Sequence, residues 1–299
     1  MVPGIDPRVD YAFKKVFGSE TSTPILAEFL GAVLQPAHPI VELHLLNPFN
    51  EKDGADDKLS ILDIKARDDL GQYYNVEMQL FGSQVQLQRI LYYWAVLHSD
   101  QLREAQKYTA LRPTYSIAIV NTVLFADVPD YHLNFQLRSD RHPQLIFSAQ
   151  QSIHLLELPK FRKTADELDD PLDLWCYFLT HGAELDSAEL PRVLQTPMMQ
   201  RAMEVLDMLA KNDVERERYQ ARLKWERDQT AFIDEALEQG REQGREQGRE
   251  QGEWIGRIQM AQDLLDIPAT SREELASLSA EELQERARAL EQQLRARNN

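Results

Sequence analysis

Two carboxylates and one amide occupy positions from which they could act together on a metal ion. Asp63 lies inside an apolar stretch, where burying an unpaired carboxylate would be costly. Glu77 and Gln79 lie in a later stretch that is rich in aromatic and β-branched residues. Two carboxylates within hydrogen-bonding distance repel each other unless a proton or a metal ion lies between them. Hard oxygen ligands of this kind suit Mg²⁺ or Mn²⁺.

The elements that must position these side chains are two strands joined by a turn. The turn falls at residues 68–72, where Asp and Gly supply local hydrogen bonds and a positive φ. Side chains alternate across a strand, so Glu77 and Gln79 share one face. If the two strands pair as a hairpin, Asp63 and Glu77 converge on one small site.

These residues also carry a family resemblance. Asp63 followed by Glu77-Met78-Gln79 resembles the D…(E/D)-x-K signature of the PD-(D/E)XK nuclease superfamily, with Gln79 where the superfamily usually has lysine. The wider chain resembles the Rpn family of recombination-promoting nucleases, which are also described as transposases. The resemblance covers most of the chain, and its main stretches, in order, are residues 10–18, 62–66, 74–79 and 89–93.

The resemblance implies roles for three acids. Asp63 and Glu77 would be the metal ligands in phosphodiester hydrolysis, where the metal binds the scissile phosphate and lowers the pKa of a bound water. Without the resemblance, both acids could simply lie at a surface edge of the sheet. Asp10, in the first matching stretch, would either add a third carboxylate near the metal or pair with Lys14 one helical turn later.

Position 79 departs from the superfamily signature. A lysine there would supply positive charge in the transition state. Gln79 can orient a catalytic group, but it carries no charge. Lys65 lies two residues after Asp63, on the same face of the predicted strand. We interpret Lys65 either as the compensating catalytic cation or as a solvated lysine at a strand end.

Candidate DNA contacts flank the predicted hairpin in the sequence. Arg89 and Tyr92 lie on a helix predicted for residues 84–108. Arg89 could grip a phosphate with two hydrogen bonds, or it could form a salt bridge to an acid of the site. Lys14 and Lys15 could line a groove for the DNA backbone, although each considered alone is an ordinary surface charge.

Composition narrows the classes of protein that fit. The formal net charge of −16 over 299 residues argues against a protein that coats DNA through general basicity, but not against a local basic groove. The single cysteine, Cys176, permits no internal disulfide, and no cysteine cluster indicates zinc. The sequence has no signal-peptide core and no apolar run of membrane-spanning length, so we expect a cytoplasmic protein with no membrane partner.

The order of predicted elements indicates an α/β fold with a mixed central sheet flanked by helices. This is the restriction-endonuclease-like core that the PD-(D/E)XK resemblance implies, here followed by an α-helical C-terminal region. We expect a nuclease domain at residues 1–165, a helical extension at 166–211 and a long charged helical tail at 212–299.

The predicted tail contains a Gly-Arg-Glu-Gln repeat with glycines at positions 240, 244, 248 and 252. Each glycine costs about 0.8–1 kcal/mol of helix propensity relative to alanine. Arg–Glu pairs one turn apart offset part of that cost. The segment is therefore a marginal helix, either a spacer or a surface for pairing with a second helix. We expect a homo-oligomer, most simply a dimer, formed through these C-terminal helices.

The sequence therefore favours a Mg²⁺- or Mn²⁺-dependent DNA endonuclease. No base-reading motif is visible, so we expect little sequence specificity. The family resemblance associates such an enzyme with recombination, with transposase-like cleavage and with defence against foreign DNA. The alternative is a nuclease-fold protein with a weakened site that acts as an interaction and oligomerisation module. Gln79 and the acidic tail favour that alternative.

Overall fold

The computed structural model of the chain describes residues 2–47, 63–79, 84–103 and 105–297. It divides into two compact units, Met1–Glu226 and Arg227–Asn299, and the boundary falls within one long helix. Each unit has its own hydrophobic core. No helix in the described ranges is both long enough and apolar enough to cross a membrane.

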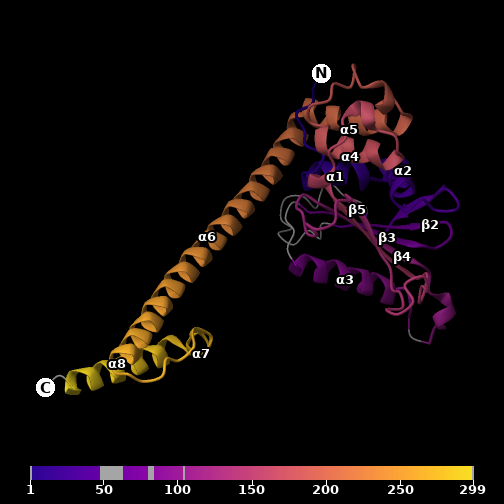
Figure 1. The fold of residues 1–299 in the computed structure, drawn as a ribbon. Helices are drawn as coiled ribbons and strands as arrows, with labels where there is room; N and C mark the ends of the chain where they lie inside the picture. The colour runs from indigo at the N-terminus through magenta and orange to yellow at the C-terminus, as the bar shows by residue number, and fades with distance from the viewer. Residues whose placement is uncertain (1, 48–62, 80–83, 104, 298–299) are drawn as a thin grey trace. The chain divides into compact units, whose positions relative to one another are not determined.

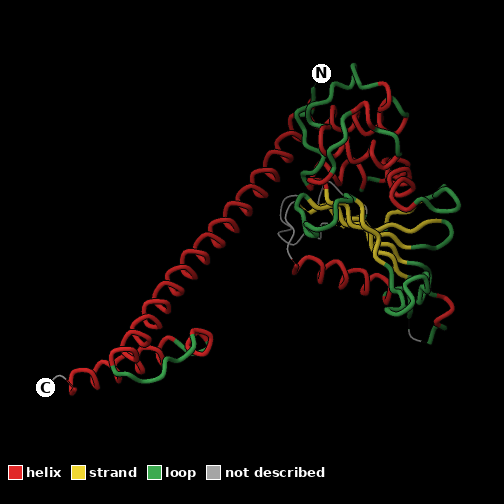
Figure 2. The backbone as a smooth tube through the Cα atoms, in the orientation of Figure 1, coloured by secondary structure: helices red, strands yellow, loops and turns green. Residues whose placement is uncertain are grey.

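A mixed six-stranded sheet in the order β1-β2-β3-β4-β6-β5 forms the centre of the first unit (Figures 1 and 2). The strands are β1 (Leu43–Leu45), β2 (Asp63–Asp68), β3 (Tyr73–Gln79), β4 (Thr114–Val120), β5 (His132–Phe135) and β6 (Gln151–Glu157). Strand β3 pairs antiparallel with β2 and parallel with β4, and β4 pairs parallel with β6. The predicted α/β fold with a mixed central sheet is confirmed.

Helices cover both faces of this sheet (Figure 1). One face packs against α1 (Asp10–Phe17), α2 (Thr23–Leu34), α4 (Pro171–His181) and α5 (Pro197–Lys211). The opposite face packs against α3 (Gln84–Ser99). Short 3₁₀ turns complete the unit: η1 (Glu20–Ser22), η3 (Tyr108–Ala110), η4 (Leu158–Lys160), η5 (Ala165–Glu167) and η6 (Arg192–Leu194). Because side chains alternate along each strand, every strand between these layers divides its side chains between two environments.

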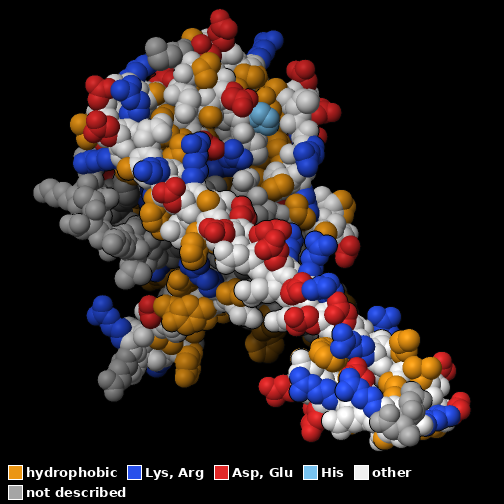
Figure 3. All heavy atoms as spheres, turned by 90° about the vertical axis from the view of Figure 1, so that its left-hand side faces the viewer, with side chains coloured by type: hydrophobic (Ala, Val, Ile, Leu, Met, Phe, Trp, Pro, Cys, Tyr) orange, Lys and Arg blue, Asp and Glu red, His pale blue; other side chains and the backbone are white. Residues whose placement is uncertain are grey.

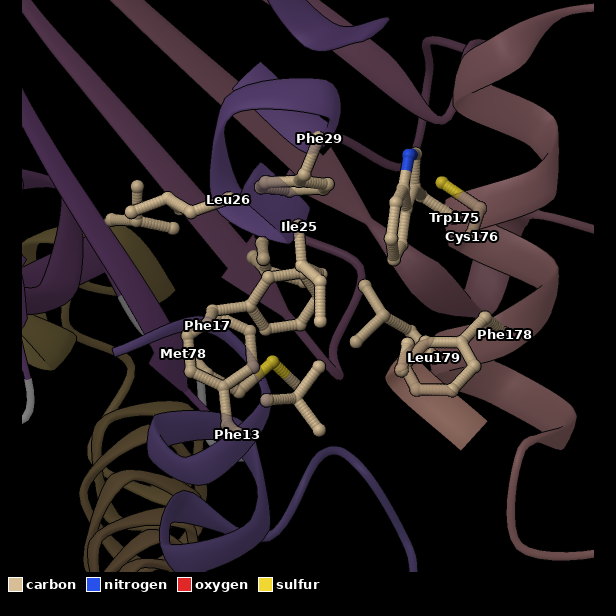
Figure 4. Close-up of a cluster of buried hydrophobic side chains, with 14 of the residues drawn as sticks. Phe13, Phe17, Ile25, Leu26, Phe29, Met78, Trp175, Cys176, Phe178 and Leu179 are labelled. Atoms are coloured by element: carbon tan, nitrogen blue, oxygen red, sulfur yellow. The ribbon is translucent and has the colours of Figure 1, made fainter. Parts of the chain in front are cut away.

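The main core lies between the sheet and the four helices on one face. Figure 4 shows Phe13 and Phe17 of α1, Phe29 of α2, Met78 of β3 and Trp175 of α4 meeting there. Tilted and edge-on ring contacts join the aromatic side chains, as aromatic quadrupoles prefer. Helices within the predicted extension at 166–211 thus share a core with the sheet. This core fixes α1 and β3 relative to each other.

Helix α3 ends at Ser99, earlier than the predicted end at residue 108. Ala105 has a φ of 67°, which a right-handed helix does not accommodate, so the helix cannot continue through it. Beyond the helix end, Gln101 bonds to the backbone of Arg112. Its Oε1 accepts from the Arg112 backbone N–H at 2.8 Å, and its Nε2 donates to the Arg112 carbonyl at 3.1 Å.

The second unit consists of helices packed around a small apolar core. It comprises the later part of α6 (Asp213–Leu264) together with α7 (Arg272–Ala276) and α8 (Ala280–Arg297). Ile258 and Leu283 are fully buried in this core. The glycine repeat lies within α6, where a Cβ added to any of its glycines would meet open space. Chain entropy alone disfavours these glycines, and no close packing in the described part of the chain requires them.

Candidate active site

The strand register sets Asp63 of β2 directly opposite Glu77 of β3. The same pairing sets Lys65 opposite Asn75. Residues directly opposite each other on antiparallel strands project to the same face, and Gln79 joins that face by alternation. The hairpin that the sequence predicts is therefore present. The Asp63 side chain lies outside the described residues, so only the backbone register places it.

This polar set occupies the face that α3 covers. Glu77 and Gln79 of β3 are level with Ala118 and Val120 of the parallel strand β4. Ala118 and Val120 in turn pack with Ile90 of α3. The site is therefore enclosed on one side by the sheet and on the other by the first half of α3. The four-helix layer belongs to the opposite face.

Glu77 is a buried carboxylate held by its two nearest neighbours on the same strand face. It is 1% exposed. Its Oε1 accepts from Asn75 Nδ2 at 2.9 Å, and its Oε2 accepts from Gln79 Nε2 at 2.8 Å. These hydrogen bonds offset part of the cost of taking the charge out of water. An ionised carboxylate offers about four lone-pair positions, so about two remain for a cation.

The oxygen donors at this point of the sheet suit a hard divalent cation. Mg²⁺ keeps several of its waters and is usually held by one or two carboxylates together with substrate phosphate. The register sets Asp63 opposite Glu77, and metal binding by this pair stays a prediction. Within the described ranges, no three His, Cys, Asp or Glu side chains gather into a metal-binding group.

Asp10 lies at the start of α1, and its carboxylate has two cationic neighbours. Lys14 Nζ is 3.4 Å from Oδ1, and Arg222 Nη2 of α6 is 3.1 Å from Oδ2. Burial raises the pKa of Asp10, while Lys14 and Arg222 act in the opposite direction. Of the two alternatives for Asp10, the pair with Lys14 is present. The place of Asp10 among metal ligands stays a prediction.

The start of α1 is also tied to the end of the sheet where Gln79 lies. Arg8 Nη1 donates to Asn121 Oδ1 at 3.3 Å. The Asn121 backbone N–H then donates to the Gln79 carbonyl at 3.0 Å. This chain of hydrogen bonds brings the neighbourhood of Asp10 to the same edge of the sheet as the polar set. Asp10 is therefore close enough in the fold to remain a candidate for the site.

From the sequence, Lys14 and Lys15 were expected to be either DNA contacts or ordinary surface charges. In the structure both side chains are buried. Lys15 Nζ lies 3.0 Å from Glu215 Oε2 and 5.6 Å from the centre of the Tyr11 ring. Tyr11 in turn donates its hydroxyl to the same Glu215 oxygen at 2.9 Å. These lysines are buried because the first part of α6 packs against α1. The expectation of ordinary surface charge is therefore wrong, and the ammonium groups face carboxylates of the same unit.

Helix α3 presents Arg89 and Tyr92 to solvent. Tyr92 is 64% exposed. The Arg89 guanidinium carbon lies 5.7 Å from the centre of the Tyr93 ring, which is a cation–π contact. On the face drawn in Figure 3, Lys and Arg side chains are mixed with Asp and Glu side chains. Contact of Arg89 and Tyr92 with DNA stays a prediction.

Sequence reasoning overlooked two parts of this arrangement. Asn75 shares the face of Glu77 and Gln79, and strand alternation alone was enough to find it. Arg222 and Glu226 of α6 also reach α1, and Glu226 Oε1 accepts from the Asp10 backbone N–H at 3.0 Å. Burial raises the pKa of Glu226 to about 7. No local sequence pattern signals this contact between residues so distant in the chain.

Residues 7–236 match the family model described as PD-(D/E)XK nuclease family transposase. The chain belongs to this family. The matched range contains every site residue named above, and it confirms the resemblance drawn from the sequence. No curated protein and no solved structure matches the chain. As a PD-(D/E)XK nuclease family transposase, the protein is of the nuclease, and hence hydrolase, kind. Membership implies DNA as the substrate, and PD-(D/E)XK nucleases typically use divalent metal ions.

Proposed function

We propose that this protein is a metal-dependent DNA endonuclease in which Asp63 and Glu77 hold Mg²⁺ or Mn²⁺. The observation that carries the proposal is the register that sets Asp63 opposite the buried carboxylate of Glu77. Membership of a nuclease family supplies the reaction class, which is phosphodiester hydrolysis. No base-reading element is identified, so the proposed enzyme has little sequence specificity.

The proposed mechanism assigns distinct tasks to the residues of this face. A divalent ion, when bound, supplies charge to the scissile phosphate and a water of lowered pKa. Gln79 and its hydrogen bond orient Glu77. Lys65, half-buried on the same face, contributes the positive charge that the family signature usually places at position 79. Asp10 is proposed as a third carboxylate at the edge of the site.

DNA would reach the site along the exposed side of α3. Arg89 is proposed to contact a phosphate, because a guanidinium can donate two parallel hydrogen bonds to it. Tyr92 offers an exposed ring beside it. Lys14 and Lys15 belong to this proposed surface only if phosphate displaces their carboxylate partners, Asp10 for Lys14 and Glu215 for Lys15. We further propose a cytoplasmic role in recombination-promoting or transposase-like cleavage, including defence against foreign DNA.

The second candidate function is an interaction module built on a weakened nuclease site. Gln79 favours it, because the amide that replaces the usual lysine is engaged with Glu77. The exposed glycine repeat of α6 also favours it, since a second helix could approach closely there. Under this alternative, the C-terminal helices form a homo-oligomer and the first unit cleaves nothing. Homo-oligomerisation through α6 is equally compatible with the enzyme.

Plasmid DNA distinguishes the two candidates. Purified protein is incubated with supercoiled plasmid in Mg²⁺, in Mn²⁺ and in EDTA. The enzyme is expected to nick or linearise the plasmid in either metal but not in EDTA. Asp63→Ala should abolish this cleavage and leave the circular dichroism spectrum unchanged. If folded, contaminant-free Asp63→Ala protein still cleaves the plasmid, then Asp63 is not a metal ligand of the reaction and the proposed function is wrong.

Two variants test the proposed cation. Lys65→Ala is expected to lower turnover far more than DNA binding, because the ammonium group acts on charge that develops in the transition state. Equal losses in turnover and binding would instead indicate a simple phosphate contact. Gln79→Lys restores the usual family residue. Unchanged or lower activity in this variant would indicate a site already built around an amide.

A further inference from the structure

Asn75 is the third polar residue on the Glu77 face of β3, and no role in the family signature falls on it. It is 2% exposed. Its Nδ2 donates to Glu77 Oε1 at 2.9 Å, on the side of the carboxylate opposite Gln79. The carboxylate is therefore gripped at both oxygens by amides two residues before and two residues after it.

The hydrogen bond from Asn75 to Glu77 leaves the other polar atom of the Asn75 amide in an unfavourable position. Its Oδ1 is buried and has no hydrogen-bond partner among the described residues. A carboxylate can only accept hydrogen bonds, so the amide must turn Nδ2 toward Glu77 and leave Oδ1 pointing elsewhere. A buried acceptor without a donor is unfavourable, and each such group in a folded protein calls for an explanation.

We propose that Asn75 is a positioning residue of the metal site, which fixes Glu77 so that its remaining lone pairs face the cation. The inference rests on the proposed function, since it concerns the same metal site. Hydrogen bonds to metal-ligating carboxylates set ligand orientation and raise affinity. With Gln79 holding Oε2 alone, the carboxylate could still rotate about its last torsion. The bond from Asn75 removes that freedom.

Ser116 provides a matched control on the adjacent strand. It lies level with Asn75 in the parallel pairing of β3 and β4 and is buried to the same degree. Its hydroxyl also has no hydrogen-bond partner in the described part of the chain. Loss of polarity at Ser116 therefore resembles loss of polarity at Asn75 in burial and position. Of these two residues, it is Asn75 that donates a hydrogen bond to Glu77.

The test measures Mn²⁺ binding to the full-length protein by electron paramagnetic resonance of the free ion. Asn75→Leu keeps a side chain of similar shape and removes the donor. Its Kd for Mn²⁺ is expected to rise about tenfold, the lower end for lost hydrogen bonds to metal ligands. The Mg²⁺ concentration for half-maximal cleavage should rise in parallel, while the KM for DNA stays unchanged. Ser116→Ala should bind Mn²⁺ as the wild type does.

A rise in Kd of less than about threefold in folded Asn75→Leu protein overturns the inference, and a larger rise supports it. If this variant does not fold, the inference is tested on the wild-type protein instead. Mg²⁺ is then titrated while the side-chain amide resonances of Asn75 are followed by nuclear magnetic resonance. Resonances that move with Mg²⁺ support the inference, and resonances that stay fixed overturn it. Failure of the proposed function would be seen earlier, as a wild type that neither binds Mn²⁺ nor cleaves DNA.

Discussion

A pair of histidines in the sheet, His154 buried and His132 half-buried, should contribute a loss of stability to the first unit in mild acid. His132 Nε2 and His154 Nδ1 are 2.9 Å apart, and their rings stack with centroids at 5.1 Å. Ser152 Oγ donates to Asn134 Oδ1, so it accepts from His154 Nε2 at 3.0 Å. His154 Nδ1 is then the bare nitrogen that accepts from His132. A proton added at Nδ1 would set two donors against each other.

The size of the effect follows from the shifted pKa. Burial, together with the smaller effect of the neighbouring His132, lowers the pKa of His154 from 6.5 to about 4. The unfolded chain therefore takes up this proton near pH 6.5, and the folded chain only near pH 4. Between these values the unfolded state binds more protons, so the free energy of unfolding falls as the pH falls. From pH 7.5 to pH 5.0 the loss contributed by His154 is about 2 kcal/mol, at about 1.4 kcal/mol per pKa unit. The raised pKa of Glu226 acts in the opposite direction, so the prediction concerns the difference between the wild type and a variant without His154.

Urea unfolding at pH 7.5 and pH 5.0, in metal-free buffer, measures this loss. His154→Gln removes this contribution, so between the two pH values its free energy of unfolding should change by about 2 kcal/mol less in the destabilising direction than that of the wild type. His38→Gln, which replaces an exposed histidine, is the control and should keep the full loss. If His154→Gln loses as much stability as the wild type over this range, the pair is not the source and the reasoning fails.

Two further predictions concern other parts of the chain. Asp173→Ala should lower the free energy of unfolding by about 2–3 kcal/mol, because the buried carboxylate accepts from Tyr131 at 2.8 Å and Lys163 at 2.6 Å; a loss under about 1 kcal/mol in urea unfolding contradicts this. Replacing Gly244 and Gly248 together by alanine should stabilise α6 by about 1 kcal/mol per site. Analytical ultracentrifugation should show weaker self-association, and unchanged association would place any interface elsewhere.

The hairpin is the part of the site that the sequence predicts best. A turn with Asp and Gly fixes where the strands reverse, and the two-residue period of a strand then fixes the faces. Asp63 and Glu77 consequently fall opposite each other, as the pattern indicates. The same rule places Asn75 beside Glu77. A family signature directs attention to residues 63, 77 and 79, and Asn75 was overlooked for that reason.

The burial of Lys14 and Lys15 could not be predicted from sequence. Helical periodicity identifies the apolar face of α1, but it does not reveal which later segment packs on its polar side. Glu215, which pairs with Lys15, and Arg222, which pairs with Asp10, both come from α6, some two hundred residues further along the chain. The sequence around Glu215 and Arg222 is highly charged, which by itself indicates a solvent-exposed helix. Only the tertiary fold shows that α6 begins as part of the first unit.

The most direct test of the central claim is Mg²⁺-dependent plasmid cleavage by Glu77→Gln. The glutamine has the shape of the glutamate, but it loses the negative charge and an NH2 donor replaces one acceptor oxygen, so the amide of Asn75 or Gln79 must turn its oxygen toward it. If Asp63 and Glu77 hold the metal, cleavage should fall to the level of the EDTA control while the circular dichroism spectrum shows that the variant is folded. Cleavage at the wild-type rate by folded Glu77→Gln protein would contradict the account.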